Sequence, residues 1–244
     1  MENISLSETV LIIGLAGPMG SGKTTLAGYL ERNWRCTKRF SFATGIRRIM
    51  SLVYGFSEEQ LMDGKFKSTP HAALGGNTPR YALQVIGTEG FRAANPDTWV
   101  NYTMREIREA VQTPRATTLH VVVIDDVRFP NEVKAIKDAG GVLVYINRLP
   151  DVNTKQNPVP ATEGYEQWYR RLLSGFRQRL NGRAFGAKPH ASEANFTLIL
   201  EQADLVIESP ARWGAENDME FSRSDAECKE TQLASFARKL QIFL

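Results

Sequence analysis

The chain has 244 residues, of which 42% are hydrophobic and 23% charged, and its formal net charge is +3 at pH 7. This length suits one α/β domain with a sizeable core, and the composition is ordinary for a globular protein. The net charge is too small to favour a nucleic-acid-binding or packaging role, although a mild positive balance suits an anionic substrate.

The amino-terminal residues and the cysteines indicate the cellular compartment of the protein. Residues 1–9 carry no basic region, and the apolar run 10–17 is shorter than a signal core or a membrane span. Cys36 and Cys228 lie far apart and form no ligand pattern, so we expect free thiols in a reducing compartment. The expected protein is therefore cytoplasmic, with no nucleic-acid or membrane partner.

Apolar runs along the chain predict buried strands. These runs are 10–15, 39–43, 119–125, 141–147 and, more weakly, 203–208. The first, third and fourth lack alternation, which favours parallel strands covered on both faces. Helical patterns lie between and after the strands, at 23–34, 45–54, 79–93, 97–111, 131–139 and 225–240. The alternation of strand and helix predicts a three-layer, doubly wound α/β fold with a parallel sheet, forming a single domain over 1–244.

Two stretches depart from this alternation. Residues 63–78 are loop-like. Residues 149–190 begin as a polar, proline-containing loop and continue as a basic amphipathic segment with five arginines between 170 and 183. An insertion of this length between core strands is typical of a lid, so we expect this segment to close over phosphates. A static helical hairpin is the alternative.

The stretch "GPMGSGKT", residues 17–24, matches the phosphate-binding pattern G-x-x-x-x-G-K-[ST] directly after a predicted strand and before a helix. Its glycines let backbone N–H groups wrap a polyphosphate at the helix N-terminus. In a surface loop, Lys23 would reach the β- and γ-phosphates, and the Thr24 hydroxyl would bind Mg²⁺. The expected nucleotide-binding residues here are Gly17, Gly20, Ser21, Gly22, Lys23, Thr24 and Thr25.

The stretch "VVVIDDVRFPNE" (121–132) ends a buried strand in two aspartates. Side chains alternate along a strand, so Asp125 and Asp126 cannot both face the metal. We place Asp126 in the candidate metal and substrate site, although the sequence leaves open which of the two faces Mg²⁺, and a helix cap is the alternative role. Arg128 follows at the carboxyl end of the strand, where open α/β sheets bind ligands.

A polar stripe follows one face of the helix predicted at 79–93. At 100° per residue, Arg80, Gln84, Gly87 and Phe91 fall close together, and Thr88 borders them. The opposite, core-facing side is made by Ala82, Leu83, Ile86 and Ala93. The stripe could bind a phosphate and a base, with Gly87 allowing close approach, or it could be a solvated face.

These features together resemble the deoxynucleoside monophosphate kinases of tailed bacteriophages. The resemblance rests on the phosphate-binding loop, "FSFATGIRRIM" and "YGFSEEQL" at 40–61, "TPRYALQVIGTEGFRAANPDTWVN" at 78–101 and "VVVIDDVRFPNEVKAIKDAGGVLVYINR" at 121–148. "HASE" (190–193) and "ADLVIE" (203–208) complete it. The chain departs from the family at Thr44-Gly45, where an Asp-Pro pair is common, and at Arg47, where a lysine is common.

The resemblance implies transfer of a phosphoryl group from ATP, with Mg²⁺, to a deoxynucleoside monophosphate. It implies an acceptor-binding helical region at about 44–113 and a lid at about 149–190. The implied acceptor-site residues are Arg47, Arg80, Gln84, Gly87, Thr88, Trp99, Asp126, Arg128 and Glu193. Lys23, Arg80 and Arg128 would be catalytic, and Arg148 would border the ATP base or the lid hinge. His190 would orient substrate or lid, or be a surface histidine.

Two other functions stay open at this point. Another P-loop small-molecule kinase, such as one similar to dephospho-coenzyme A kinase, would carry the same loop. A nucleotide-dependent switch is less favoured because the chain lacks the Asn-Lys-x-Asp motif that GTPases use to read the base. The sequence does not decide which bases are accepted, and it leaves the oligomeric state open, with a homodimer as the candidate assembly.

Overall fold

The computed structural model describes residues 10–112, 121–148, 195–209 and 223–240. Five strands form one sheet in the order β2-β3-β1-β4-β5, and every neighbouring pair is parallel. The strands are β1 (Leu11–Ala16), β2 (Thr37–Phe40), β3 (Val121–Val127), β4 (Val142–Arg148) and β5 (Leu205–Ser209). Each overlaps its predicted run, so the prediction of a parallel α/β sheet is confirmed.

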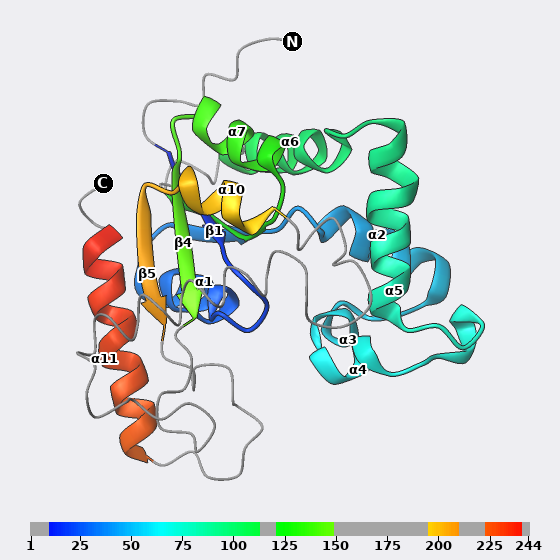
Figure 1. Cartoon of the computed structure of the whole chain (residues 1–244), viewed down its shortest axis with the longest axis horizontal. Helices are drawn as coiled ribbons and strands as arrows, with labels where there is room; N and C mark the ends of the chain where they lie inside the picture. Colours follow the sequence, from blue (N-terminus) through cyan, green and yellow to red (C-terminus); the bar gives the residue numbers. More distant parts are fainter. Residues whose placement is uncertain (1–9, 113–120, 149–194, 210–222, 241–244) are drawn as a thin grey trace, which may run out of the picture.

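Helices cover both faces of the sheet and make three layers (Figure 1). Successive strand residues point to opposite faces, so Ile13 and Leu15 pack toward one layer while Ile12 packs toward the other. The first layer consists of α1 (Lys23–Asn33) and α11 (Arg223–Leu240), and the second of α6 (Thr98–Gln112), α7 (Pro130–Asp138) and α10 (Phe196–Glu201). The short helix α10 is absent from the sequence prediction. Within the described ranges, no helix has the length and apolarity that crossing a bilayer requires.

The chain between β2 and α6 forms a helical region beside the sheet (Figure 1). Its elements are α2 (Thr44–Tyr54), α3 (Glu58–Met62), α4 (Gly64–Ser68), a 3₁₀ turn (Ala72–Leu74), α5 (Pro79–Gln84) and a π-helix (Val85–Arg92). The region has its own small core around the buried side chains Met50, Phe56 and Leu61.

The prediction of a loop over 63–78 is wrong for α4, which a local cap stabilises. The Asp63 carboxylate accepts a hydrogen bond from the backbone N–H of Phe66 at 2.6 Å and satisfies one of the first free donors of the helix. The Phe66 ring then packs edge-on against Phe56, with ring centroids 5.4 Å apart. This contact fixes a helix of only five residues to the core of the helical region.

The helix predicted at 79–93 changes its winding at Val85. It starts as expected, because Thr78 accepts a hydrogen bond from the Tyr81 N–H at 3.2 Å and Pro79 occupies the first turn. From Val85 to Arg92 the chain is a π-helix, which has more residues per turn than an α-helix and is rare outside functional sites. Beyond this point the side chains need not follow the faces predicted at 100° per residue.

Glycines bring α2, the π-helix and α6 close together. A Cβ at Gly87 would lie 2.7 Å from Ile46 Cδ1, and a Cβ at Gly45 would lie 2.7 Å from Cζ3 of Trp99. The buried Trp99 indole also donates a hydrogen bond to the Gly87 carbonyl at 2.8 Å. Gly87 is therefore needed for packing between helices, and the close approach of a ligand to this glycine stays a prediction.

The Gly87→Ala variant tests this packing. The added methyl meets Ile46 Cδ1, so we expect the free energy of unfolding to fall by about 1–3 kcal/mol, the usual cost of overpacking. Adding Ile46→Val to Gly87→Ala removes that Cδ1 atom and should recover part of the loss. Urea unfolding followed by circular dichroism measures both variants.

Gly64→Ala is the matched control, because a new Cβ there meets no atom within 4 Å. It should cause no loss of stability. If Ile46→Val and Gly87→Ala prove additive, the contact between them is not the cause and the steric explanation fails.

Candidate active site

The turn between β1 and α1 is built on glycines. Gly17, Gly20 and Gly22 have φ values of 138°, 75° and 94°, in the left-handed region that other residues rarely adopt. The Lys23 ammonium donates a hydrogen bond to the Gly17 carbonyl at 2.7 Å, and only 9% of this lysine is exposed. The lysine is therefore folded into the loop.

A cavity of about 460 Å³ lies where this loop, the carboxyl ends of β2 and β3, and the helical region meet. Of the predicted nucleotide-binding residues in the loop, Gly20, Lys23 and Thr24 line it. The others shape the loop without lining the cavity: Gly17, Ser21, Gly22 and Thr25. Met19 also lines it, and its sulfur lies 3.7 Å from an Arg80 nitrogen of the helical region.

Asp125 is the acidic residue that meets the phosphate-binding loop. Its carboxylate accepts a hydrogen bond from the Thr24 hydroxyl, and the residue is 7% exposed. Burial, and next the charge of Asp126, raise the pKa of Asp125 to about 6. A carboxylate beside a threonine hydroxyl supplies the hard oxygen ligands that suit Mg²⁺, which also keeps water and substrate phosphate oxygens as ligands.

Asp126 points to the other side of the strand, where its carboxylate stabilises a turn. Its carboxylate accepts hydrogen bonds from the Ser41 hydroxyl at 2.6 Å, the Phe42 N–H at 2.8 Å and the Ala43 N–H at 2.9 Å. These bonds hold the turn between β2 and α2. Asp126 lines the cavity, as expected of a metal and substrate ligand, but its oxygens already accept hydrogen bonds from the Ser41 hydroxyl and two backbone N–H groups, which makes Asp125 the better candidate for the metal.

The polar stripe lines the cavity, except that Arg92 and not Phe91 contributes at its far end. Its members that line the cavity are Arg80, Gln84, Gly87 and Thr88. Phe91 does not line it and packs against Trp99 instead, while Arg92 takes its position. Ala93, expected to face the core, is exposed. Both errors come from the π-helix, whose wider turn shifts each side chain after Val85 away from its α-helical position.

Besides Lys23, five cationic side chains from different elements line the cavity, and one of them is Arg92 of the π-helix. Arg47 comes from α2, Lys67 from α4, Arg80 from α5 and Arg128 from the turn after β3. The Arg47 side chain is 13% exposed. Its guanidinium donates to the Thr44 hydroxyl at 3.1 Å. The sequence pattern does not point to Lys67, because this residue lies in the loop-like stretch 63–78. Asp63, which can cap a helix, is the available signal for a helix there.

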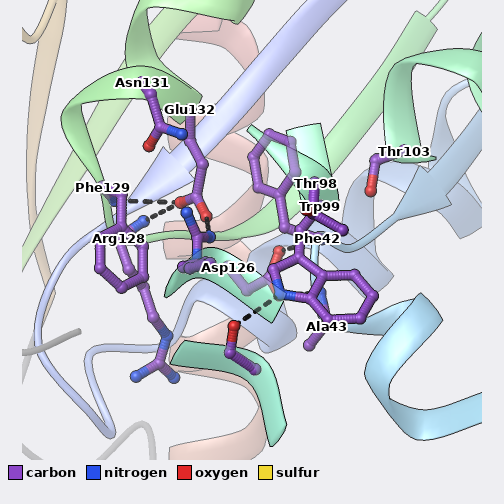
Figure 2. A network of polar contacts seen from close by, with 12 residues as sticks. Phe42, Ala43, Thr98, Trp99, Thr103, Asp126, Arg128, Phe129, Asn131 and Glu132 are labelled. Carbon is purple, nitrogen blue, oxygen red and sulfur yellow. Dashed lines mark hydrogen bonds and ion pairs between the residues drawn. The ribbon is translucent and has the colours of Figure 1, made fainter. Parts of the chain in front are cut away.

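A buried ion pair joins the helical region to the turn that carries Arg128. The Glu132 carboxylate accepts hydrogen bonds from the backbone N–H groups of Arg128 at 2.6 Å and Phe129 at 3.0 Å, and it also binds Arg92. The Arg92 guanidinium stacks 3.8 Å from the Phe129 ring centroid. Figure 2 shows the Arg128 side chain extending away from Glu132 while its backbone faces the carboxylate.

Burial and the neighbouring donors shift the pKa of Glu132 in opposite directions. Complete burial raises the pKa of Glu132 to about 7, whereas Arg92 and the two backbone donors favour the ionised form. A buried carboxylate that receives three donors also fixes the geometry of its partners. The pair therefore orients the backbone from which Arg128 projects, a role that the sequence pattern did not reveal.

Three predicted residues and the predicted lid do not enter this site description. Arg148 is the last residue of β4, where its backbone pairs with Ser209 of β5. Glu193, His190 and the predicted lid at 149–190 lie outside the described residues. Among the described residues, no group of three or more His, Cys, Asp or Glu side chains forms a metal cluster.

Two viral proteins are similar to this chain in sequence. A protein of Acanthamoeba polyphaga mimivirus, provisionally named deoxynucleotide monophosphate kinase, is 35% identical over 145 residues, which cover 57% of this chain and 75% of the viral protein. Uncharacterized protein ORF76 of Ictalurid herpesvirus 1 (strain Auburn) is 29% identical over 151 residues, which cover 62% of this chain and 53% of ORF76. No family model matches the sequence.

Likenesses among solved structures are remote. A shikimate kinase from Bacteroides thetaiotaomicron has a TM-score of 0.43 and 16% identity over 93% of this chain and 98% of its own. A dephospho-CoA kinase from Campylobacter jejuni has a TM-score of 0.34 and 14% identity over 95% of this chain and 98% of its own. The phosphate-binding loop, the parallel sheet and the match to most of the mimivirus protein place the chain among P-loop kinases, and it belongs to the deoxynucleotide monophosphate kinase family.

Proposed function

We propose that the protein phosphorylates deoxynucleoside monophosphates with ATP, giving deoxynucleoside diphosphates and ADP. The observation that carries this proposal is one cavity lined both by the phosphate-binding loop and by five cations outside that loop, of which only Arg92 is committed to the buried pair with Glu132. One polyphosphate engages Lys23 and the loop. The additional cations suit a second, separate anion, which is what a monophosphate acceptor brings.

The donor side is proposed to hold ATP and Mg²⁺. The loop backbone and Lys23 would bind the β- and γ-phosphates, and Thr24 with Asp125 would hold the metal directly or through its water. When bound, Mg²⁺ neutralises charge on the phosphates during transfer. Arg148 at the end of β4 is proposed to border the base or a lid hinge. Closure by 149–190 and a contact from Glu193 remain proposals from sequence.

The acceptor side is proposed to be the helical face of the cavity. Arg47 and Arg80 would bind the acceptor phosphate, and the Gln84 amide and Thr88 hydroxyl would reach the base or sugar. Trp99 supplies an apolar wall, because its indole N–H is already bonded to the Gly87 carbonyl. Arg128 would stabilise charge on the transferred phosphoryl group.

The reaction requires positioning more than acid–base chemistry. A phosphate oxygen of the acceptor is already a competent nucleophile, so no catalytic base is needed. The residues of this chain act by holding the two phosphates in line, by balancing their negative charge and by keeping water out of the cavity. Glu132 contributes indirectly, by fixing the backbone of Arg128.

The decisive experiment measures ADP release from ATP against all deoxyribonucleoside and ribonucleoside monophosphates. We expect release with at least one deoxynucleoside monophosphate and a preference for it over its ribonucleotide counterpart. ADP release that no nucleotide acceptor stimulates, while another phosphorylated small molecule does, would assign the protein to a different kinase activity. Slow hydrolysis alone would favour a nucleotide-dependent switch.

Lys23→Ala should reduce kcat by about a hundred- to thousandfold, because it removes a donor aimed at the transferring phosphate. Coupled ADP-release kinetics measure the change, and circular dichroism checks the fold. Lys134→Ala is the control, since Lys134 pairs with Asp138 in solvent on α7. A folded Lys23→Ala variant with near-normal kcat would exclude the loop lysine from the mechanism.

Asp125→Asn and Asp126→Asn should have opposite effects. Asp126→Asn replaces an acceptor by a donor that faces Ser41 and two backbone N–H groups, so the free energy of unfolding should fall by about 1–3 kcal/mol. Asp125→Asn removes a buried carboxylate whose pKa burial and Asp126 raise to about 6, so that above pH 6 it is ionised in the folded protein at a cost in stability. At pH 8 it should therefore leave stability unchanged or higher, while activity falls by about a hundredfold or more.

Urea unfolding and Mg²⁺ titration of kcat separate these two effects. A fall in stability for Asp125→Asn together with normal stability for Asp126→Asn would reverse the assignment of the two aspartates.

Arg80→Ala should raise the KM for the acceptor by about ten- to hundredfold and leave the KM for ATP within about twofold, because Arg80 lies on the helical side of the cavity. Steady-state kinetics with each substrate varied in turn test this. Arg105→Ala is the matched control: Arg105 is on α6, exposed and paired with Glu109. Equal effects on both KM values would point to a role outside acceptor binding.

A further inference from the structure

Helix α4 directs one lysine into the cavity and another to solvent. The helix is anchored by Phe66, whose ring packs against both Phe56 and His71 at centroid distances of 5.4 and 5.8 Å. With Phe66 fixed, Lys67 is half-buried and lines the cavity, whereas Lys65 is exposed. The position of Lys67 is therefore set by packing and is not that of a freely moving surface side chain.

The charges around Lys67 are mostly of its own sign. Burial, and after it the charges of Arg80, Arg47 and Arg128, lower the pKa of the Lys67 ammonium, and Asp63 opposes them. Asp63 already accepts the Phe66 N–H as the cap of α4. Like charges held close together destabilise the folded protein unless an anion joins them.

We infer that Lys67 is a substrate-binding residue that holds the phosphate group of the acceptor. The inference rests on the proposed function and extends it, because it makes α4 the part of the site that selects a phosphorylated acceptor. Lys67, Arg47 and Arg80 all come from the helical region, while the phosphate-binding loop has its own lysine. A dianionic monophosphate placed among these three cations relieves their repulsion and gains charge-assisted hydrogen bonds.

A structural role for Lys67 makes a different prediction. If the lysine stabilised α4 through Asp63, removing it would lower stability. If it is held among like charges for the sake of a ligand, removing it leaves the free protein as stable or more stable, and weakens only acceptor binding. The two roles therefore differ in the sign of one measurable quantity, the thermal midpoint without ligand.

The test compares Lys67→Gln with Lys65→Gln, which changes the same charge on the same helix outside the cavity. For Lys67→Gln we expect the KM for the deoxynucleoside monophosphate to rise about ten- to hundredfold and the KM for ATP to change less than about twofold. The thermal midpoint without ligand should be equal to or above that of the wild type. Lys65→Gln should match the wild type throughout, and Lys67→Arg, which keeps the charge, should retain part of the acceptor affinity.

Two results would overturn the inference. One is an acceptor KM of Lys67→Gln within twofold of the wild type. The other is a lowered thermal midpoint of Lys67→Gln without ligand, accompanied by a loss in activity that scales with the unfolded fraction.

Failure of the proposed function is recognised separately. If the wild type phosphorylates no deoxynucleoside monophosphate, inorganic phosphate serves as the probe, and its thermal stabilisation of Lys67→Gln is compared with that of Lys65→Gln. Both variants keep the phosphate-binding loop, so a smaller response of Lys67→Gln still assigns Lys67 to an anion site. Equal responses overturn that assignment as well.

Discussion

Three hydrogen bonds to the carboxylate of Asp126 connect the sheet to the helical region. They come from Ser41, Phe42 and Ala43, the residues that lead from β2 into α2. Bonds to a partly buried carboxylate are stronger than neutral ones, and a donor left without its partner there would be costly. The start of α2, and with it Arg47, is therefore held relative to β3, the strand that also presents Asp125 to Thr24.

The same strand end is tied to the helical region a second time through Glu132. Arg92 and Glu132 are nearly inaccessible to solvent, and Phe129 covers the guanidinium. A buried ion pair contributes little net stability, but breaking it leaves an uncompensated charge, so its partners keep their relative positions. The π-helix makes this contact available, because its wider turn brings Arg92 to the side where an α-helix would have put Phe91.

The cavity concentrates charge that the free protein does not need for folding. Lys67 is held near three arginines and Asp125 is buried next to Asp126, although Arg39 lies 4.0 Å from the Asp125 carboxylate and Arg47 lies 3.7 Å from that of Glu58. Such arrangements destabilise the free state and are relieved by ligands of opposite charge, a divalent cation at Asp125 and phosphates at the cations. A site that binds two anionic substrates requires this kind of prearranged charge.

The sequence by itself determined the elements whose information is local. Unbroken apolar runs specified parallel strands, and the loop "GPMGSGKT" specified a glycine turn because only glycine adopts φ values such as 138° and 94° without strain. The sequence also assigned four residues to one candidate site: Arg47, Arg80, Gln84 and Arg128. Only the tertiary structure decided between Asp125 and Asp126, since that choice depends on which way β3 faces the neighbouring turn. It likewise decided the rotation of the π-helix and the inward position of Lys67, because both follow from contacts between segments far apart in the chain, which no local pattern records.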